Sequence, residues 1–100
     1  MFNESDDFKD LNEYFIKLGW LYDSKYLTNE IQHLYKKNGD YIKILCNKNN
    51  INVSVPIDIG NYKANYNTNF KSIFMATHYV YNHLNYYEKK QNNSILEETP

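Results

Sequence analysis

The sequence contains no arginine and, in 100 residues, only one cysteine, three glycines and two prolines. A single cysteine, Cys46, leaves no intramolecular disulfide, which excludes a small secreted scaffold built on disulfides. The three glycines stand apart, so no glycine-rich phosphate loop is present. No apolar run approaches membrane-spanning length, and the acidic start does not resemble a secretory signal. We therefore expect a cytoplasmic protein in a reducing compartment, with no membrane contact.

Aromatic residues are abundant, with 11 Tyr, 5 Phe and one Trp. They supply large buried areas per side chain, and the length suits one domain. We expect a single domain over 1–100, with a core from about 5 to 90 and a frayed tail over 91–100. The net charge is −1, but the first 13 residues are acidic and the body from Lys25 to Lys90 is mildly basic. That asymmetry suits a polyanion partner, although acids in a first helical turn also oppose the helix dipole.

The first predicted element is a helix from Ser5 to Leu18. Apolar residues recur at helical spacing, Ser5 can cap the helix and Gly19 follows as a stop. Residues 24–38 allow two interpretations. Leu27, Ile31 and Leu34 fit a helix, whereas alternation around Ile31 also fits a strand.

Two strands are predicted next, Tyr41–Cys46 and Ile51–Ile57, joined by an Asn-rich turn. Pro56 places the second strand at an edge, because proline cannot donate to a ladder. A polar loop is predicted over 58–67, and then a helix over 69–90 capped by Thr68. The fold class is α+β: α-β-β-β-α, with a three-stranded antiparallel sheet packed on two helices. The alternative is α-α-β-β-α, with 24–38 helical.

No set of residues in the sequence suggests catalysis. His78 and His83 are five residues apart, whereas two metal ligands on one helical face need a spacing of three or four. Cys46 lies between apolar neighbours in a strand, as an inert buried thiol does. We therefore predict no enzyme, no metal site and no cofactor.

Tyrosines in the polar loop and late in the last helix are the candidate contact residues. Lysines such as Lys63 are interleaved with Tyr62 and Tyr66 in the loop and with Tyr86 and Tyr87 in the helix. Exposed Tyr gives large contact area at small entropy cost. A Tyr-rich composition would also place some Tyr on any surface. The two interpretations carry equal weight.

The segment Leu11–Trp20, which ends in Lys-Leu-Gly-Trp, resembles the first helix of double-stranded RNA-binding domains. Tyr26 is placed where that family starts its first strand. Tyr41–Ile44 is similar to its second strand and Ile57–Gly60 to the end of its third, and a long helix completes the order. Only the ten-residue segment is motif-like. The resemblance implies an α-β-β-β-α fold and duplex RNA as a partner.

Three segments would carry the RNA contacts that the resemblance implies. They are Glu13 on the first helix, the loop Lys36-Lys37-Asn38-Gly39, and Lys71 at the start of the last helix. The loop lacks the family's Pro-x-His, and the family's lysine run is reduced to Lys71. Because phosphate contacts supply most of the affinity for duplex RNA, this chain looks like a degenerate member of the family.

The function expected from the sequence is a non-catalytic binding module. It would act through protein–protein contact, or through weak sequence-independent binding of duplex RNA. The alternative is a stand-alone inhibitor of a host defence protein, encoded by a phage or virus and acting by direct protein binding. A homodimer is a further expectation, since an edge at Pro56 and an aromatic helix face both allow a symmetric pair. The candidate contact residues are Glu13, Lys36, Lys37, Asn38, Tyr62, Lys63, Tyr66 and Lys71.

Overall fold

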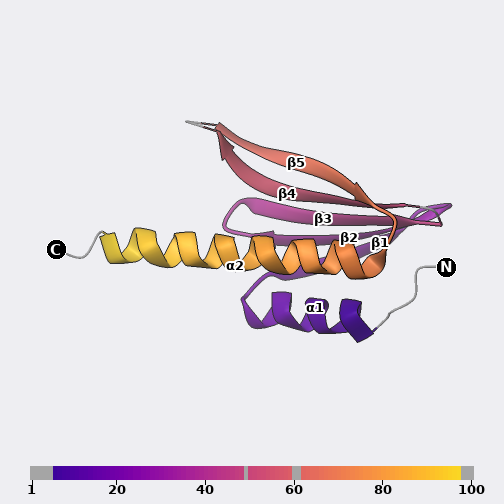
Figure 1. Cartoon of the computed structure of the whole chain (residues 1–100), viewed down its shortest axis with the longest axis horizontal. Coiled ribbons are helices and arrows are strands. Elements are labelled where there is room, and N and C mark those ends of the chain that lie inside the picture. Colours follow the sequence, from indigo (N-terminus) through magenta and orange to yellow (C-terminus); the bar gives the residue numbers. More distant parts are fainter. Residues whose placement is uncertain (1–5, 49, 60–61, 98–100) are drawn as a thin grey trace.

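The computed structural model describes residues 6–48, 50–59 and 62–97. Its elements are, in order, α1 (Asp6–Lys17), β1 (Leu21–Tyr26), β2 (Glu30–Lys37), β3 (Asp40–Asn47), β4 (Ile51–Ile59), β5 (Tyr62–Phe70) and α2 (Ile73–Glu97). The strands form one antiparallel sheet in the order β1-β2-β3-β4-β5. Both helices lie on the same face of this sheet (Figure 1). The chain is therefore α+β.

The predicted three-stranded sheet is wrong, because the sheet has one further strand at each edge. Residues 24–38 are not one helix, as the alternative had it, nor one strand: they hold the end of β1, a turn and β2. The predicted loop over 58–67 is instead the end of β4 and most of β5. Edge strands keep most of their side chains in solvent, so no apolar run marks them in the sequence.

Helix α1 confirms the first predicted element. Leu11 and Phe15 are fully buried one turn apart, and the helix is followed by Gly19 with a positive φ of 91°. The Gly19 N–H donates to the Ile16 carbonyl at 3.0 Å and the Trp20 N–H to the Phe15 carbonyl at 3.0 Å. These bonds satisfy carbonyls that the helix end would leave unpaired. The predicted cap, Ser5, lies outside the described residues.

An aromatic cluster joins α1 to the sheet. The ring of Tyr35 on β2 stacks on Phe15 with centroids 3.7 Å apart, and its hydroxyl donates to Asn12 Oδ1 at 2.7 Å. Trp20 meets Phe15 edge-on at 5.6 Å. The predicted alternation of β3 and β4 is confirmed, because their inward residues complete the core. These are Ile42, Ile44 and Cys46 on β3 and Ile51, Val53 and Val55 on β4.

Helix α2 differs from its prediction at both ends. It begins at Ile73 rather than 69, and Ser72 is its cap: the Ser72 hydroxyl accepts from the Met75 N–H at 3.4 Å. Thr68, the predicted cap, lies in β5. The helix continues to Glu97, beyond the predicted end at 90, while 98–100 lie outside the described residues. At 1.5 Å per residue, its 25 residues span roughly 37 Å, and its last turns project beyond the sheet (Figure 1).

Strand β4 is an interior strand rather than the predicted edge strand. It pairs with β5 along its whole length, from Ile51 opposite Phe70 to Ile59 opposite Tyr62. Its pairing with β3 stops at Ser54, opposite Lys43. Pro56 therefore lies where β4 has a partner on one side only, which is the position a residue without an N–H tolerates. Among the described residues, no helix is long and apolar enough to cross a membrane.

Candidate functional site

The far half of the β4–β5 hairpin diverges from β3 (Figure 1). Beyond the last β3–β4 pair, Pro56 offers no N–H to continue the ladder. The side chain of Asn65 on β5 fills the gap, because its Nδ2 donates to the Tyr41 carbonyl at 3.1 Å and to Ser54 Oγ at 3.1 Å. An amide side chain thus replaces the missing ladder bond and holds the diverging hairpin in place.

His83 of α2 also contacts this hairpin. Burial lowers the pKa of its imidazole, and a hydrogen bond to the backbone of Pro56 opposes this effect without reversing it. The imidazole is therefore mostly neutral at pH 7. The diverging half of the hairpin is therefore held to α2 by the bond between His83 and the Pro56 carbonyl, which the β3–β4 ladder does not use.

Two tyrosines of β5 are left uncovered on the helix side of the hairpin. Phe70 at the other end of β5 faces the same side and packs on Tyr79 of α2, with ring centroids 5.2 Å apart. Tyr66 and Tyr62, four and eight residues back, share that face because side chains alternate along a strand. They are 56% and 76% exposed. Helix α2 covers one end of β5 and leaves the other open.

A third exposed tyrosine comes from α2 itself. Tyr86 follows Tyr79 and His83 at helical spacing, so it lies on the side of α2 that faces the β4–β5 hairpin. Tyr86 is 62% exposed, and its ring lies 6.2 Å from that of His83. We call Tyr62, Tyr66 and Tyr86 the tyrosine surface. It is the candidate site.

Charged groups at this end of the molecule are mostly engaged. Lys63 Nζ lies 3.8 Å from Asp40 Oδ1, and the Tyr87 hydroxyl donates to Asp40 Oδ2 at 2.8 Å. Burial, with Asp40 adding to it, raises the pKa of Tyr87 to about 12. Lys37 Nζ donates to the Leu18 carbonyl and lies 3.1 Å from Glu88. Lys37, a predicted contact residue, therefore ties β2 to both helices.

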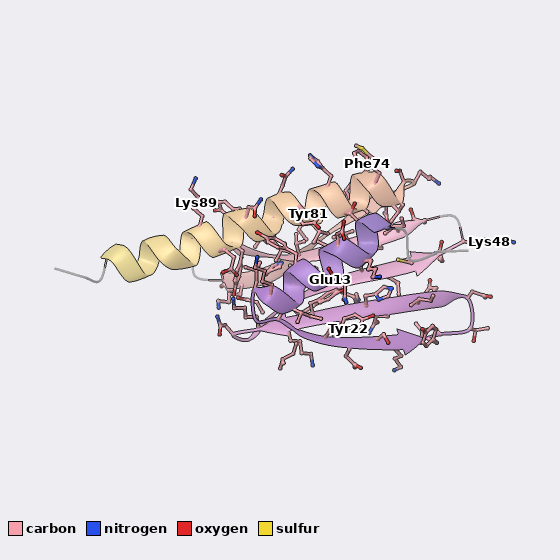
Figure 2. All side chains as sticks on the ribbon, turned by 90° about the horizontal axis from the view of Figure 1, so that it is seen from below. Glu13, Tyr22, Lys48, Phe74, Tyr81 and Lys89 are labelled. Carbon is pink, nitrogen blue, oxygen red and sulfur yellow. The ribbon has the colours of Figure 1, made fainter. Side chains whose placement is uncertain are left out.

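The other predicted contact residues lie at the two ends of the sheet and on the exposed side of α1. The turn containing Asn38 joins β2 and β3 at the end where the β4–β5 hairpin closes (Figure 1). Lys36 stands beside this turn on the outer face of β2, opposite Tyr41 of β3. Lys71 follows β5 at the opposite end, across strands that span roughly 30 Å for nine residues. Glu13 is exposed on α1, facing away from the sheet (Figure 2). The chain thus does not gather these groups into one basic surface.

Comparison with protein-family models, curated proteins and solved structures finds no match to this chain. The site is therefore interpreted from its own geometry.

Other groups considered from the sequence are placed as follows. Cys46 is 1% exposed, and burial raises the pKa of its thiol to about 12, so it stays protonated at neutral pH. Within the described residues, no three His, Cys, Asp or Glu side chains gather closely enough to hold a metal ion. A hollow of about 210 Å³ between α1 and α2 is lined by Asp10, Phe74, Thr77, His78 and Tyr81. It mixes apolar and polar walls without a buried charged group among these residues.

Some residues that shape the site could have been found in the sequence. Tyr62, Ala64, Tyr66, Thr68 and Phe70 alternate with polar residues, which is the period of a half-buried strand. Asparagine at three intervening positions hides this pattern, because it is depleted in strands. The hydrogen bonds of Asn65 and His83 depend on how the tertiary fold places Pro56 relative to β3 and α2. No local pattern reveals them.

Proposed function

We propose that this chain is a non-catalytic binding module that contacts another polypeptide through the tyrosine surface. The observation behind the proposal is the exposure of Tyr62, Tyr66 and Tyr86 around β5, whose outer edge has no neighbouring strand among the described residues. Tyrosine is enriched at protein interfaces, where its ring gives large contact area and its hydroxyl a hydrogen bond. Exposed aromatic side chains next to an unpaired edge support contact with a polypeptide chain.

Binding of duplex RNA is less favoured by the same geometry. The lysines beside the β2–β3 turn lie at the opposite end of the sheet from Lys71, and Lys37 forms an ion pair with Glu88. The outer face of the sheet carries Lys25, Lys36, Lys43 and Lys63 but also Asp23 and Glu30. Among the side chains that the structure describes on this face, Tyr41 is the one aromatic residue. Affinity for nucleic acid grows with the number of phosphate contacts and stacked bases. A polypeptide is the better fit.

A random peptide library tests the proposed surface. Wild-type protein is immobilised at low density, so that neighbouring copies cannot meet, and used to select from a library of random twelve-residue peptides. We expect selected peptides to lose at least about tenfold in affinity for the double variant Tyr62→Ala with Tyr66→Ala, as truncated hot spots do. Tyr26→Ala is the matched control, because Tyr26 is 77% exposed on the other edge strand. It should leave affinity within about twofold, a free-energy change too small for a hot spot.

Two results would contradict the proposal. One is a selection that enriches no peptide above an unrelated control protein. The other is an affinity loss that is equal for the Tyr26 variant and for the double variant. Circular dichroism and urea unfolding of each variant separate loss of contact from loss of fold.

A further inference from the structure

The free edge of β5 is long and lacks the features that usually prevent strand pairing. Its nine residues, Tyr62–Phe70, contain no proline, no glycine and no acidic residue. Its one charged residue, Lys63, lies 3.8 Å from Asp40. Natural edge strands usually carry charges, prolines or bulges that stop another strand from adding. This edge is therefore open to a further strand.

The hairpin register indicates which backbone groups face this edge. Ile59 and Tyr62 are partners at the closed end of the β4–β5 hairpin and stand three positions apart in the sequence, and such a closing pair exchanges hydrogen bonds with each other. Bonding toward β4 then alternates along β5, so the N–H and C=O groups of Lys63, Asn65, Asn67 and Asn69 point outward. Four regularly spaced residues thus present donors and acceptors to a neighbour.

A second copy of β5 fits this edge in antiparallel orientation. With Tyr66 opposite its own counterpart, all nine residues of each strand find partners, and the outward-pointing groups of the two copies meet in phase. Tyr62 then faces Phe70 of the second copy, Ala64 faces Thr68, and Lys63 faces Asn69. No like charges stand opposite one another, and the central pair of aromatic residues is a favourable cross-strand pair.

The exposed area suggests a weak pair rather than a permanent one. Tyr62 and Tyr66 are 76% and 56% exposed, so covering both rings buries roughly 200–300 Å² in each copy. A stable interface buries about 800 Å² per partner, and the strand backbone and Tyr86 must supply the rest. We expect dissociation in the micromolar range.

We propose that two copies of this chain pair through β5, antiparallel and with Tyr66 at the two-fold axis, to form a continuous ten-stranded sheet. This inference rests on the proposed function and names its polypeptide partner: a second copy. The helices of both copies then lie on one face of the joined sheet, because a two-fold axis through such a strand pair runs perpendicular to the sheet.

Sedimentation across a concentration series is the first test. The wild type is expected to shift with rising concentration from the 12.0 kDa chain to twice that mass. Asn67→Pro removes an outward N–H and should weaken self-association at least about tenfold. Ser24→Pro is its matched control. The β1–β2 turn is closed by Leu27 and Glu30, which bond each other, so the Ser24 N–H points to the β1 edge; this variant should associate like the wild type.

Disulfide capture tests the register even if a proline variant fails to fold. The native thiol of Cys46 is buried, so an introduced cysteine is the reactive one. Tyr66→Cys should form a covalent dimer under mild oxidation, because its counterpart lies directly opposite in a non-hydrogen-bonded pair, where side chains come closest. Tyr26→Cys, on the β1 edge, should cross-link at least about tenfold more slowly. Both are read on a non-reducing gel.

Three outcomes overturn the pairing: a wild type that stays at 12.0 kDa into the millimolar range, association unchanged by Asn67→Pro in a folded variant, or capture no faster at position 66 than at 26. If selected peptides still require Tyr62 and Tyr66 in that case, the proposed function stands and only the identity of the partner is wrong. If peptide binding also fails, both proposals are wrong.

Discussion

The two edge strands of this sheet differ in how they meet solvent. Strand β1 has six residues, with Asp23 and Lys25 on the outer face. On the inner face the Tyr22 hydroxyl lies 2.7 Å from His33 Nδ1, and the two rings stack at 5.9 Å. Strand β5 has nine residues with Lys63 as its one charge, and Tyr62 and Tyr66 are exposed on its inner face. Both edges leave backbone groups unpaired, but only β1 carries the alternating charges that disfavour a further strand.

The difference shows how one sheet can have an edge protected by charge and an edge that is nearly uncharged. Helix α1 packs beside β1 and β2, where Phe15 stacks on Tyr35. Helix α2 covers the Phe70 end of β5, and the hairpin diverges from it toward Tyr62 (Figure 1). The predictions below change one edge at a time, and each has a matched change on the other.

The largest effect on stability is expected at the anchored end of β5. Phe70→Ala removes the ring that packs on Tyr79 and leaves a cavity beside Ile51, its partner across the hairpin. We expect a loss of about 2–3 kcal/mol in the free energy of unfolding, measured by urea denaturation. Leu21→Ala on β1 should cost less than about 0.5 kcal/mol, since Leu21 is 75% exposed. Equal losses would show that β5 is no better anchored than β1.

Acid should weaken the β1 side through His33. Burial lowers the pKa of this histidine from 6.5 to about 4 in the folded chain. Above pH 6.5 both folded and unfolded chains hold it neutral. As pH falls toward 4 only the unfolded chain takes up the proton, so stability is lost over this window and levels off below it. The loss is at most about 3–4 kcal/mol, because one pKa unit corresponds to about 1.36 kcal/mol.

The variant His33→Gln isolates this effect, because glutamine keeps an acceptor for the Tyr22 hydroxyl and does not titrate in this range. Carboxylates protonate in wild type and variant alike. The difference between the two urea-derived free energies should therefore shrink as pH falls from 7 toward 4. A difference that stays constant across this window would contradict the buried, neutral histidine.

Residue patterns predicted the interior of the sheet better than its edges. The alternation of Ile42, Ile44 and Cys46 predicted β3 because burial of one face leaves a period of two in the sequence. All six residues of β1 are exposed, so burial imposes no such period there. In β5 the period of two exists, but Asn65, Asn67 and Asn69 occupy the positions on the outer face. These asparagines give the segment the composition of a loop.

The candidate site was predicted in part for the same reason. Tyr62, Lys63 and Tyr66 were found from composition alone, and the structure brings them together on one strand. Lys37 and Lys71 were chosen by resemblance. They lie far apart because the extra strand β5 runs from the end of the sheet near Lys37 to the opposite end before the chain reaches Lys71. The resemblance to double-stranded RNA-binding domains concerned α1, which is local. Strand number depends on pairing between distant segments, which a ten-residue motif does not determine.

A smaller effect is expected where the hairpin leaves β3. Asn65→Ala removes both bonds of its Nδ2, to the Tyr41 carbonyl and to Ser54 Oγ. We expect a loss of about 1–1.5 kcal/mol in the free energy of unfolding, because a carbonyl and a nearly buried hydroxyl lose their partner. Asn67→Ala, on the same face one pair along, should cost less than about 0.5 kcal/mol. Equal costs would show that Asn65 does not replace the missing ladder bond of Pro56.

The smallest effect is expected from the one charge on β5. Lys63 is 70% exposed on its side chain and 3.8 Å from Asp40, so Lys63→Met should change the free energy of unfolding by at most about 0.5 kcal/mol. Lys25→Met on β1 is its matched control for stability. For self-association the two should differ: Lys63→Met leaves β5 without charge and should strengthen pairing slightly, whereas Lys25→Met leaves Asp23 on β1 and should not change it. Sedimentation that shows weaker pairing after Lys63→Met would mean that this lysine contacts the partner, and that β5 is recognised through charge rather than through an uncharged edge.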